Sequence, residues 1–583
     1  MSSELRWQND PFKVRGRIDP TTEIGREVLK QPPATRYELW SYYLYYNGNN
    51  GYNLYYFLPT FLQYLAQQGG FDPTKAGRPK CQLTSNTDNA PCNVPWLNLQ
   101  DGIPVVSMVM YVTAISFSAQ FVIFTTFGSL ADYGRYNHYI LIVATLISCV
   151  AQILPIFYIN NDGSGWITIL VLNIIALTAY GVTLVFYTAA FPLLSDNLPL
   201  VRSVRADPMI SIEETQLIVE KWRNHVSAVS TAFSNIGFLI YSGVFVGVSF
   251  IPWYNGPFVN DQSGTFGNTL AYYCIGSVVG GAYCLVNALP YFILRPVGRK
   301  GPPLPPDQSH FTVGWKSIFQ ALKEAKKYRY LYLYIVSYFL FTDGVNAISV
   351  LQQFLQNEIT DFSATANAGM GLVTAVFSLI GCFFFLFLAK QFTLSTKTIL
   401  MTIVVTTGIL PLWGCFGIGM DNFGIKTVWE LWVSSAWSGF FTGPIWAWEQ
   451  TMLAQLVPPG KENLFFGLFG IASKASSWMA FAVIGAVTEK TANPYYGWLL
   501  IAILFVLATI ILWYVDMEAA KLEMLHIEMH QELLDRMATN RISSPPPLTT
   551  TTTTEASTSV DGTDVIEKVP IIKLELYSDG SKK

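Results

Sequence analysis

Apolar residues concentrate in twelve stretches of the chain, each about twenty residues long and bounded by polar or charged segments. An α-helix of about 20 residues crosses the hydrocarbon core of a bilayer, which is about 30 Å thick. We therefore predict an all-α membrane protein. Its twelve transmembrane helices are expected at residues 37–65, 103–127, 138–160, 165–193, 226–251, 268–294, 331–352, 367–389, 398–417, 427–456, 464–487 and 496–515.

The polar segments divide the chain into six parts. In order, they are a cytosolic N-terminal segment (1–36), a first six-helix bundle (37–294), a linker (295–330), a second six-helix bundle (331–515), a charged cytosolic helix (516–541) and a tail of disordered composition (542–583). Two groups of six helices form the plan of many membrane transporters, in which the two halves are related by an internal repeat.

The linker contains an amphipathic helical pattern. Its apolar positions recur at helical spacing and its lysines mostly take the other face: Phe311, Trp315, Ile318, Phe319 and Leu322 against Lys316, Lys323, Lys326 and Lys327. This pattern is typical of a helix that lies in the membrane interface and attracts anionic lipids. A solvated helical linker is the alternative.

The composition indicates the class of protein, and the distribution of charge indicates its orientation in the membrane. Only 13% of residues are charged and mean hydropathy is +0.34, which excludes a soluble enzyme. Of the 36 Lys and Arg residues, 30 lie on the side of the predicted helices that holds both termini, so both termini are expected in the cytosol. The net charge of -3 gives no basic field for a nucleic-acid partner.

No catalytic pattern competes with a membrane role. The five histidines lie outside the centres of the predicted helices, and the chain has no Gly-rich phosphate loop followed by Lys and Ser or Thr. We expect no enzyme activity, no cofactor and no metal site. Cys81 and Cys92 share the longest loop on the non-cytosolic side, where an oxidising compartment would allow a disulfide between them.

The first predicted helix is interrupted by amides near its midpoint. Asn47, Asn49, Asn50 and Asn53 stand with Gly48 and Gly51 within seven residues. Glycine and asparagine are poor helix formers, and amides in lipid need partners. We expect an unwound or kinked turn that faces a cavity and binds substrate. Helix packing through small and amide residues is the alternative.

Two helices of the second half carry similar features. Thr342, Asp343, Gly344 and Asn346 lie at about the same depth in the seventh helix as the amides do in the first. Corresponding interruptions in two halves point to a binding site between them. The tenth helix is expected to be interrupted by Gly439, Gly443 and Pro444, and Trp446 and Glu449 follow. We predict that the first and seventh helices meet across one polar chamber.

Three ionisable groups are candidates for proton coupling or gating. Asp343 has no cation of its own in the sequence, and because its cheaper state in lipid is the neutral acid, it would load a proton at acidic pH and release it at neutral pH. Glu449 and Lys474 lie at similar depths and can pair as a gate or as plain structure. Alternatively, Lys474 pairs with Asp343 and Glu449 titrates.

Further substrate contacts are expected from polar and aromatic residues at similar depths. Tyr180, Asn235 and Asn346 would offer hydrogen bonds to a small zwitterion, and Trp446 would bound an apolar pocket. An aromatic residue in a transmembrane helix is more often there for packing, which is the alternative for Trp446.

A loop motif resembles a known superfamily. Gly128–Arg135, with Asp132 and Arg135, is similar to the short cytosolic loop signature of the major facilitator superfamily, although it is one residue short and has Tyr133 where a base is usual. Asp132 and Arg135 can pair across the interface between halves in one conformer and release in the other. A simple tight turn is the alternative.

A second motif is more specific. Leu456–Phe469 contains Pro-Pro-Gly and Phe-Phe-Gly-Leu, and Ser473–Trp478 follows. This run resembles the hairpin between the tenth and eleventh helices of the autophagy-related vacuolar amino-acid effluxers, fungal members of that superfamily. Ser473 stands where the family has an acid before the lysine.

The resemblance implies a twelve-helix major facilitator fold with 6+6 pseudo-two-fold symmetry in the vacuolar membrane. It also implies export of small neutral amino acids such as leucine after autophagy, by alternating access and with proton coupling open. A carrier of another small polar solute is one alternative. The other is a non-transporting receptor whose helix at 516–541 recruits a cytosolic protein partner.

Overall fold

The computed structural model describes most of the chain. The described residues are 26, 29–81, 92–96, 99–128, 130, 135–159, 162–207, 209–251, 269–296, 309, 311–392, 394–457, 462–520, 522–523 and 527, and the side chains of a few residues inside helices, among them Lys474, lie outside this description. Met1–Leu525 form one compact unit and His526–Lys583 another. The predicted helix at 516–541 therefore lies mostly outside the described residues.

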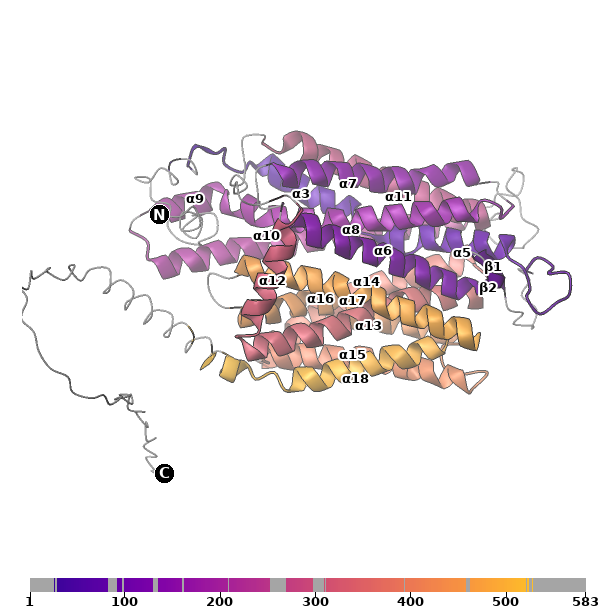
Figure 1. Ribbon diagram of the computed structural model, residues 1–583. Helices are drawn as coiled ribbons and strands as arrows, with labels where there is room; N and C mark the ends of the chain where they lie inside the picture. The colour runs from indigo at the N-terminus through magenta and orange to yellow at the C-terminus, as the bar shows by residue number, and fades with distance from the viewer. Residues whose placement is uncertain are drawn as a thin grey trace, which may run out of the picture. The chain divides into compact units, whose positions relative to one another are not determined.

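The first half of Met1–Leu525 contains helices and one hairpin. The helices are α3 (Arg36–Gly48), α4 (Tyr52–Tyr55), α5 (Phe57–Gly69), α6 (Val105–Phe127), α7 (Tyr136–Ile153), α8 (Trp166–Asp196), α9 (Pro199–Ala206), α10 (Ile212–Ser249) and α11 (Thr269–Leu294). A short 3-10 helix, Leu154–Tyr158, extends α7. Strands β1 (Asn93–Trp96) and β2 (Leu99–Pro104) pair antiparallel. Figure 1 shows these helices side by side.

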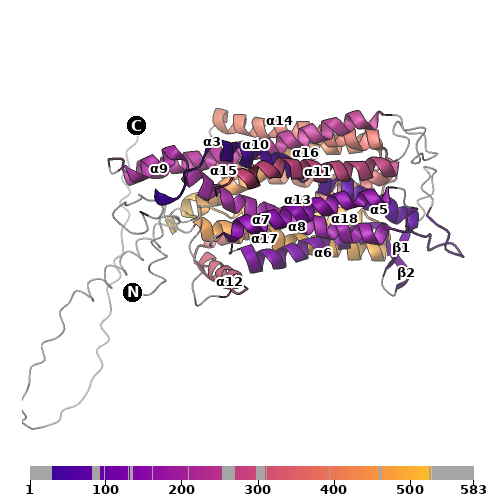
Figure 2. The same cartoon turned by 90° about the horizontal axis from the view of Figure 1, so that it is seen from above.

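The second half begins with a short surface helix and continues with six long helices. They are α12 (Val313–Ala325), then α13 (Arg329–Ile359), α14 (Ala364–Phe392), α15 (Thr396–Cys415), α16 (Val428–Leu456), α17 (Glu462–Thr491) and α18 (Tyr496–Trp513). Figure 2 gives the view from above. Most bounds agree with the predicted stretches to within a few residues, but α10 begins fourteen residues before residue 226 because its charged first turns continue the helix outside the apolar part.

Helix ends are set by local capping chemistry. The Ser211 side chain accepts the backbone N–H of Glu214 at the start of α10, and Ser395 does the same for Thr398 at the start of α15. Thr427 and Glu430 form a reciprocal capping box at the start of α16. Such caps satisfy backbone donors that the first helical turn leaves without a partner, so they fix where each helix begins.

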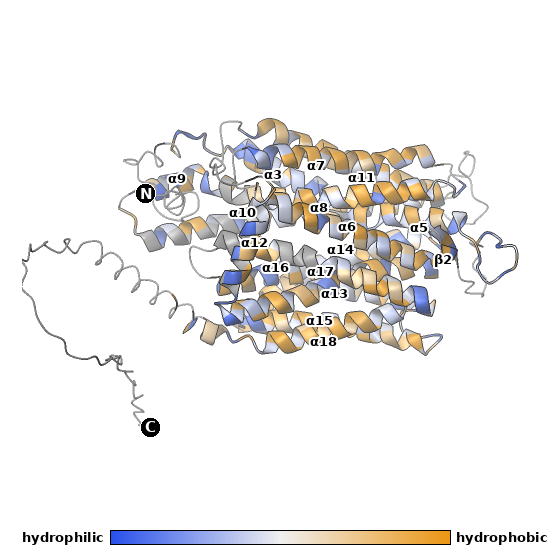
Figure 3. Cartoon of the chain, in the orientation of Figure 1, coloured by the Kyte–Doolittle hydropathy of each residue, from blue (hydrophilic) through white to orange (hydrophobic). Residues whose placement is uncertain are grey.

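Among the described residues, nine helices are long and apolar enough to cross a membrane. They are α6, α7, α8, the apolar part of α10, α11, α13, α14, α15 and α18, and Figure 3 shows the apolar residues along them. The other three predicted helices correspond to the broken α3–α5 segment and to α16 and α17. The count of twelve transmembrane helices therefore stays a prediction.

Helix packing in the two halves follows one pattern. In the first half α7 packs on α8, α6 on α8, and α3 on both α10 and α11. The equivalent pairs of the second half also pack: α15 on α16, α14 on α16, and α13 on both α17 and α18. Between the halves α6 packs on α17 and α10 on α14, two pairs that a two-fold axis would exchange. This repetition is the expected 6+6 pseudo-symmetry.

The two ends of the helical bundle differ. We call the end with β1 and β2 the hairpin end, and the end with α9 and α12 the linker end (Figure 1). At the hairpin end Cys81 and Cys92 form the predicted disulfide, with their Cα atoms 5.6 Å apart. Arg78 pairs with Asp101 at 3.1 Å beside it. Asp72 accepts the Thr74 hydroxyl and backbone N–H, which hold the pKa of its carboxyl below its usual value.

The predicted linker helix is present as α12 and lies against both halves. It contacts α6 of the first half and α17 of the second. The Trp315 and Phe121 rings are 6.4 Å apart, and the Phe311 and Phe127 rings 5.7 Å. Phe311 and Phe319 nevertheless remain 64% and 68% exposed, so part of the apolar face is uncovered by protein.

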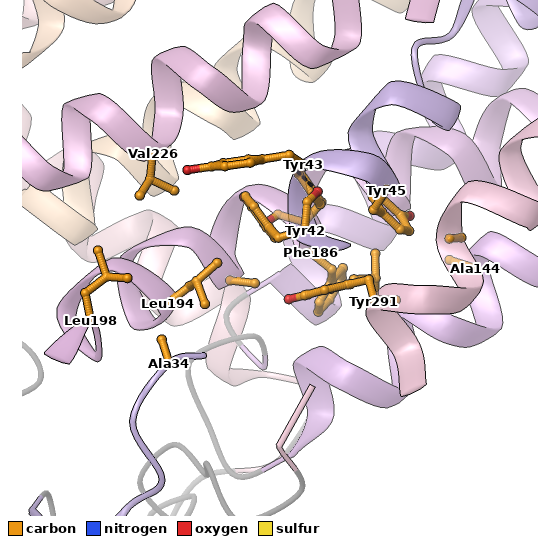
Figure 4. Close-up of a cluster of buried hydrophobic side chains, with 14 of the residues drawn as sticks. Ala34, Tyr42, Tyr43, Tyr45, Ala144, Phe186, Leu194, Leu198, Val226 and Tyr291 are labelled. Carbon is orange, nitrogen blue, oxygen red and sulfur yellow. Dashed lines mark hydrogen bonds between the residues drawn. The ribbon is translucent and has the colours of Figure 1, made fainter. Parts of the chain in front are cut away.

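An aromatic core holds the first half together near the linker end (Figure 4). The rings of Tyr42 and Tyr187 stack 4.2 Å apart, and each hydroxyl donates to the backbone carbonyl of the other residue, at 3.2 and 3.0 Å. Tyr187 also shares a hydrogen bond with Ser230, and Tyr45 with Thr145. These bonds tie α3 to α7, α8 and α10, so the start of the first helix is rigidly placed beside the break that follows.

Candidate substrate site

The first predicted helix is broken where the amides lie. α3 ends at Gly48, the chain turns through Asn49–Gly51, and α4 and α5 follow. Gly51 has a φ of 79°, a left-handed conformation that glycine adopts without a steric penalty. A Cβ there would overlap the Tyr180 hydroxyl. The unwound turn that the sequence predicted is therefore confirmed.

The amide side chains hold this break open in two ways. Asn50 caps it locally, since its Nδ2 donates to the Asn47 carbonyl at 2.9 Å and its Oδ1 accepts the Tyr52 N–H at 3.0 Å. Asn47 Nδ2 donates to the Phe233 carbonyl on α10 at 2.9 Å, and its Oδ1 accepts the Tyr283 hydroxyl of α11. The side chains thus replace helical hydrogen bonds that the turn has lost.

The remaining two amides reach other helices. Asn49 Nδ2 donates to the Thr183 hydroxyl on α8 at 2.8 Å. Asn53 Nδ2 donates to Gln152 Oε1 on α7 at 2.6 Å and to the Ser277 carbonyl on α11 at 3.0 Å. Asn53 Oδ1 is buried, and it has no hydrogen-bond partner among the described residues. An acceptor buried without a partner costs about 1–3 kcal/mol, so this atom is a candidate to accept a hydrogen bond from a bound solute.

A small cavity lies at the break. Its lining comes from α3, α4, the turn between them, α7, α8, α10 and α11: Gly48, Asn49, Asn50, Gly51, Asn53, Leu54, Gln152, Tyr180, Tyr241, Gly280, Tyr283 and Cys284. The space is narrow, with room for about one water molecule in this conformation. Its walls offer amides and phenols on an otherwise apolar frame, which suits a small polar solute.

The structure places most predicted first-half residues at this cavity. The cavity is lined by Asn49, Asn50, Asn53 and Tyr180. Asn47 is not in the lining and stabilises the break through its bond to the Phe233 carbonyl. Asn235 is half-buried on α10 and is absent from the lining. Instead α10 approaches the break at Gly237, where a Cβ would overlap the Asn47 carbonyl oxygen.

The predicted interruption of the seventh helix is wrong. α13 is one helix of 31 residues that runs through Thr342–Asn346 without a break. Gly344 lies against the Phe505 ring of α18, and Asn346 Nδ2 donates to the Ser477 hydroxyl of α17 at 3.0 Å. These residues therefore contact neighbouring helices of the same half, and they do not interrupt the backbone of α13.

Among the described residues, the cavity at the break is not the chamber that the first and seventh helices were expected to share. The lining of the cavity includes no residue of α13 or α16. Asp343 is 3% exposed, and its Oδ1 has no hydrogen-bond partner among the described residues. The reason is that α13 packs on α17 and α18, while the break packs on α8, α10 and α11.

The tenth helix is likewise continuous, which corrects the second predicted interruption. α16 runs from Val428 to Leu456 through Pro444. A Cβ at Gly439 would overlap the Thr374 carbonyl and one at Gly443 the Ser378 hydroxyl, so both glycines allow close approach of α14. Trp446 is 41% exposed and does not line the cavity.

The structure describes only some of the ionisable residues that were predicted for proton coupling or gating. Glu449 is buried on α16, and its backbone carbonyl accepts the Tyr334 hydroxyl at 2.6 Å. The side chain of Lys474 and the whole of Asp132 lie outside the described residues, so the pairings predicted for them stay predictions. Arg135 directly precedes α7.

Sequence reasoning missed a polar cluster between the halves at the hairpin end. Asn357 Nδ2 donates to Thr60 Oγ1 at 3.1 Å and to Gln63 Oε1 at 2.8 Å, which joins α13 to α5. A signal was available, because Thr60, Gln63 and Gln67 recur at helical spacing on α5, in an otherwise apolar stretch. Gln152, Tyr241 and Tyr283 of the cavity carry no comparable pattern in their own helices.

Comparison with known proteins identifies relatives. Residues 34–525 match a family model described as vacuole effluxer Atg22 like. The chain is 24% identical over 480 residues to autophagy-related protein 22 of Coccidioides immitis, with 75% of this chain and 77% of the relative covered. The corresponding figures for the Yarrowia lipolytica protein of the same name are 24% over 474 residues, 74% and 79%. The solved structure of the nucleoside transporter NupG matches with a TM-score of 0.50 at 13% identity, covering 82% of this chain and 100% of NupG.

The paired halves and the match to NupG show a fold of two related helical halves. The family match covers most of the chain. The chain therefore belongs to the vacuole effluxer Atg22-like family, and it is a multi-pass transporter of the vacuolar membrane.

Proposed function

We propose that this transporter is a secondary carrier that moves small neutral amino acids of the leucine type from the vacuole lumen to the cytosol after autophagy. The observation that carries the proposal is the broken first helix, whose amides and glycines leave a polar cavity inside the first half. Irregular backbone at membrane depth is typical of transporter substrate sites, because unwound turns expose polar groups to the substrate.

The chemistry of the cavity fits a zwitterion. An ammonium group needs acceptors, and the buried Asn53 Oδ1 is an acceptor without a partner among the described residues. A carboxylate needs donors, which the phenol group of Tyr180 can supply. Because the cavity now has room for about one water molecule, the helices around it must separate before a leucine side chain enters.

Transport coupled to protons is the second part of the proposal. Asp343 lies deep in α13 and 3% exposed, where a carboxylate is costly and the neutral acid is favoured. It would take a proton from the acidic lumen and release it to the cytosol. Glu449, Lys474, Asp132 and Arg135 are proposed to act as gates, with the pairing of Lys474 to Glu449 or Asp343 left as two alternatives.

The orientation in the membrane follows from the loops. We propose that the hairpin end faces the lumen, since the Cys81–Cys92 disulfide requires an oxidising compartment during maturation. The excess of Lys and Arg at the linker end supports a cytosolic location for both termini. The uncovered apolar face of α12, with Lys316 and Lys323 beside it, is proposed to lie on anionic lipids of the cytosolic leaflet.

Flux into and out of reconstituted vesicles tests the carrier role. We expect Asn50→Leu to lower leucine flux at least tenfold, because the turn loses two hydrogen bonds that hold the site. The control is Gln120→Leu, which removes a buried amide between α6 and α8 away from the cavity. Equal flux for both variants contradicts the proposal. Loss of signalling only on deletion of 516–583, with pathway variants silent, indicates a receptor, and flux of a different solute indicates another substrate.

A pH gradient across the same vesicles tests the coupling. We expect Asp343→Asn to abolish acceleration of leucine flux by lumenal acid, while exchange of leucine at equal pH continues. Asp343→Asn keeps the shape of the side chain and removes only its titration. If acceleration by acid persists in this variant and is lost in Glu449→Gln, Glu449 is the proton carrier in its place.

A further inference from the structure

Several of the contacts between the halves at the hairpin end form one network of neutral side chains. Besides its bonds to Thr60 and Gln63, Asn357 accepts Asn367 Nδ2 at 3.0 Å through its Oδ1. Gln63 Nε2 also donates to the Phe354 carbonyl at 3.5 Å. Three of these residues belong to the second half, and Thr60 and Gln63 to the first, so the network crosses the interface.

Asn367 extends the network to a second crossing point. Its Nδ2 also donates to the Tyr273 hydroxyl of α11 at 2.9 Å, and that hydroxyl donates to the Phe362 carbonyl at 3.1 Å. Its Oδ1 accepts Gln356 Nε2 at 3.1 Å and the Thr360 hydroxyl at 2.9 Å. The polar atoms of Asn357 and Asn367 are therefore all satisfied while the halves stay together.

The network is dry and lies outside the cavity on the hairpin side. Thr60, Gln63, Asn357 and Asn367 are each at most 2% exposed. Asn357 lies in the last turn of α13, and Asn367 and Tyr273 lie in the first turns of α14 and α11. Thr60 follows Asn53 by seven residues, or about 10 Å of helix. A solute in the cavity would have to pass this layer to reach the hairpin end.

The chemistry of the network suits a layer that opens and closes repeatedly. Separating it exchanges bonds between side chains for bonds to water, and such an exchange costs only about 0.5–1.5 kcal/mol per bond. An apolar seal of the same size would resist hydration in proportion to its area. A seal of carboxylates and cations would weaken in acid, as the carboxylates protonate.

Three carboxyl groups lie at the edges of the layer. Glu358 accepts Gln67 Nε2 at 3.3 Å and is exposed, as is Asp361 in the turn after α13. Glu489 of α17 is also exposed and accepts the Tyr111 hydroxyl of α6 at 2.6 Å. Burial raises the pKa of Asp361 above its usual value. Tyr64 contacts the Phe362 ring and Tyr273 lies in the network itself, but phenols ordinarily titrate near pH 10, far above the pH of a vacuole.

We propose that the network of Thr60, Gln63, Tyr273, Asn357 and Asn367 is the lumenal gate of the carrier, with Asn357 as its positioning residue, and that its closure does not depend on lumenal pH. This proposal rests on the proposed function, because that function assigns the hairpin end to the lumen. Its uncharged composition separates gating from the proton response, which is assigned to other residues.

Cross-linking of paired cysteines tests the gate directly. Thr60→Cys with Asn357→Cys joins the halves through a short bifunctional thiosulfonate, and we expect leucine flux to fall at least tenfold and to return on reduction. Gln352→Cys with Ser434→Cys is the matched control, because the two side chains are 3.3 Å apart but lie within the second half and outside the network. Unchanged flux after cross-linking of the first pair, or equal loss for both pairs, overturns the proposal.

Accessibility of Cys284 tests the gate without any substrate. The test therefore distinguishes a protein that has the gate but does not carry leucine from a protein in which the network is not a gate. Cys284 lines the cavity. We expect a membrane-impermeant thiosulfonate on the hairpin side to label Cys284 slowly in the unmodified protein. Because only the thiolate reacts, the rate is divided by the rate for the denatured protein at the same pH, and we expect this ratio to be the same at pH 5 and pH 7.5. Thr60→Val should raise the rate several-fold at both pH values.

Asn357→Asp should make the ratio of labelling rates depend on pH, with a high ratio at pH 7.5 and a low ratio at pH 5. An ionised carboxylate has no donor for Thr60 or Gln63, whereas the protonated acid has one O–H that can replace one of the two bonds. A ratio for the unmodified protein that changes with pH, or no response in both variants, overturns the proposal.

Discussion

The first helical segments of the two halves occupy equivalent places and behave differently. α3 packs on α10 and α11, and α13 packs on α17 and α18, so the two segments correspond under the pseudo-two-fold arrangement. Both carry glycine and polar residues near the middle of the membrane. Only the first is broken, and only the first lines the cavity.

Helix propensity does not account for this difference. Summed over Asn47–Asn53 and over Thr342–Asn346, the cost of helix formation differs by only about 1–2 kcal/mol. The difference lies in where the amides bond. Asn50 bonds to the backbone on both sides of the turn, whereas Asn346 bonds to Ser477 on another helix. Side chains that bond to the backbone N–H and C=O groups of a turn stabilise a break in the helix. Side chains that bond to other helices leave the backbone groups to the helix, which then stays continuous.

The largest expected effect comes from Gly51→Ala. An alanine at φ 79° is strained and its Cβ overlaps the Tyr180 hydroxyl, so we expect the break to shift and more than nine-tenths of leucine flux to be lost. Gly243→Ala is the control, because a Cβ at this helical position meets nothing within 4 Å. Flux that survives Gly51→Ala would show that the left-handed turn is dispensable.

The next effect separates a cavity amide from a packing amide. Asn53→Leu removes the acceptor proposed for the ammonium group, and we expect the KM for leucine to rise at least tenfold. Asn346→Leu removes one bond to Ser477 and should change KM less than threefold. Similar KM values for the two variants would mean that the two halves share the substrate after all.

The smallest effect concerns the close contact of α14 with α16. Gly443→Ala places a Cβ on the Ser378 hydroxyl, and we expect a loss of about 1–3 kcal/mol in stability, seen as a lower Tm in detergent. The KM should not change, because α16 does not line the cavity. A changed KM at unchanged Tm would place α16 in the substrate path.

The sequence predicts much of the fold, because apolar stretches of membrane length leave few alternatives. The bounds of α6 and α11 agree with the predicted stretches to within two residues. The break was also predictable, since four asparagines and two glycines in seven residues cannot all face lipid. The disulfide at Cys81 and Cys92 followed from their shared loop.

The parts that sequence reasoning missed depend on neighbours in space. Gly344 and Gly443 look like helix breakers in the sequence, but Phe505 and Ser378 lie against them and turn them into packing positions. Asn357 and Thr60 are 297 residues apart, so their hydrogen bond has no local signature. Asn53 was predicted as a ligand contact, but only its three-dimensional surroundings show that one of its atoms lacks a partner among the described residues.

The position of α12 has a mechanical consequence. This helix touches α6 and α17 and leaves Phe311 and Phe319 uncovered, so on its proposed placement at the lipid surface any rocking of one half against the other would move these aromatic side chains through the adjoining lipid. The stiffness of that lipid would then set part of the energy barrier for each transport cycle, and we expect the same protein to turn over at different speeds in soft and rigid membranes.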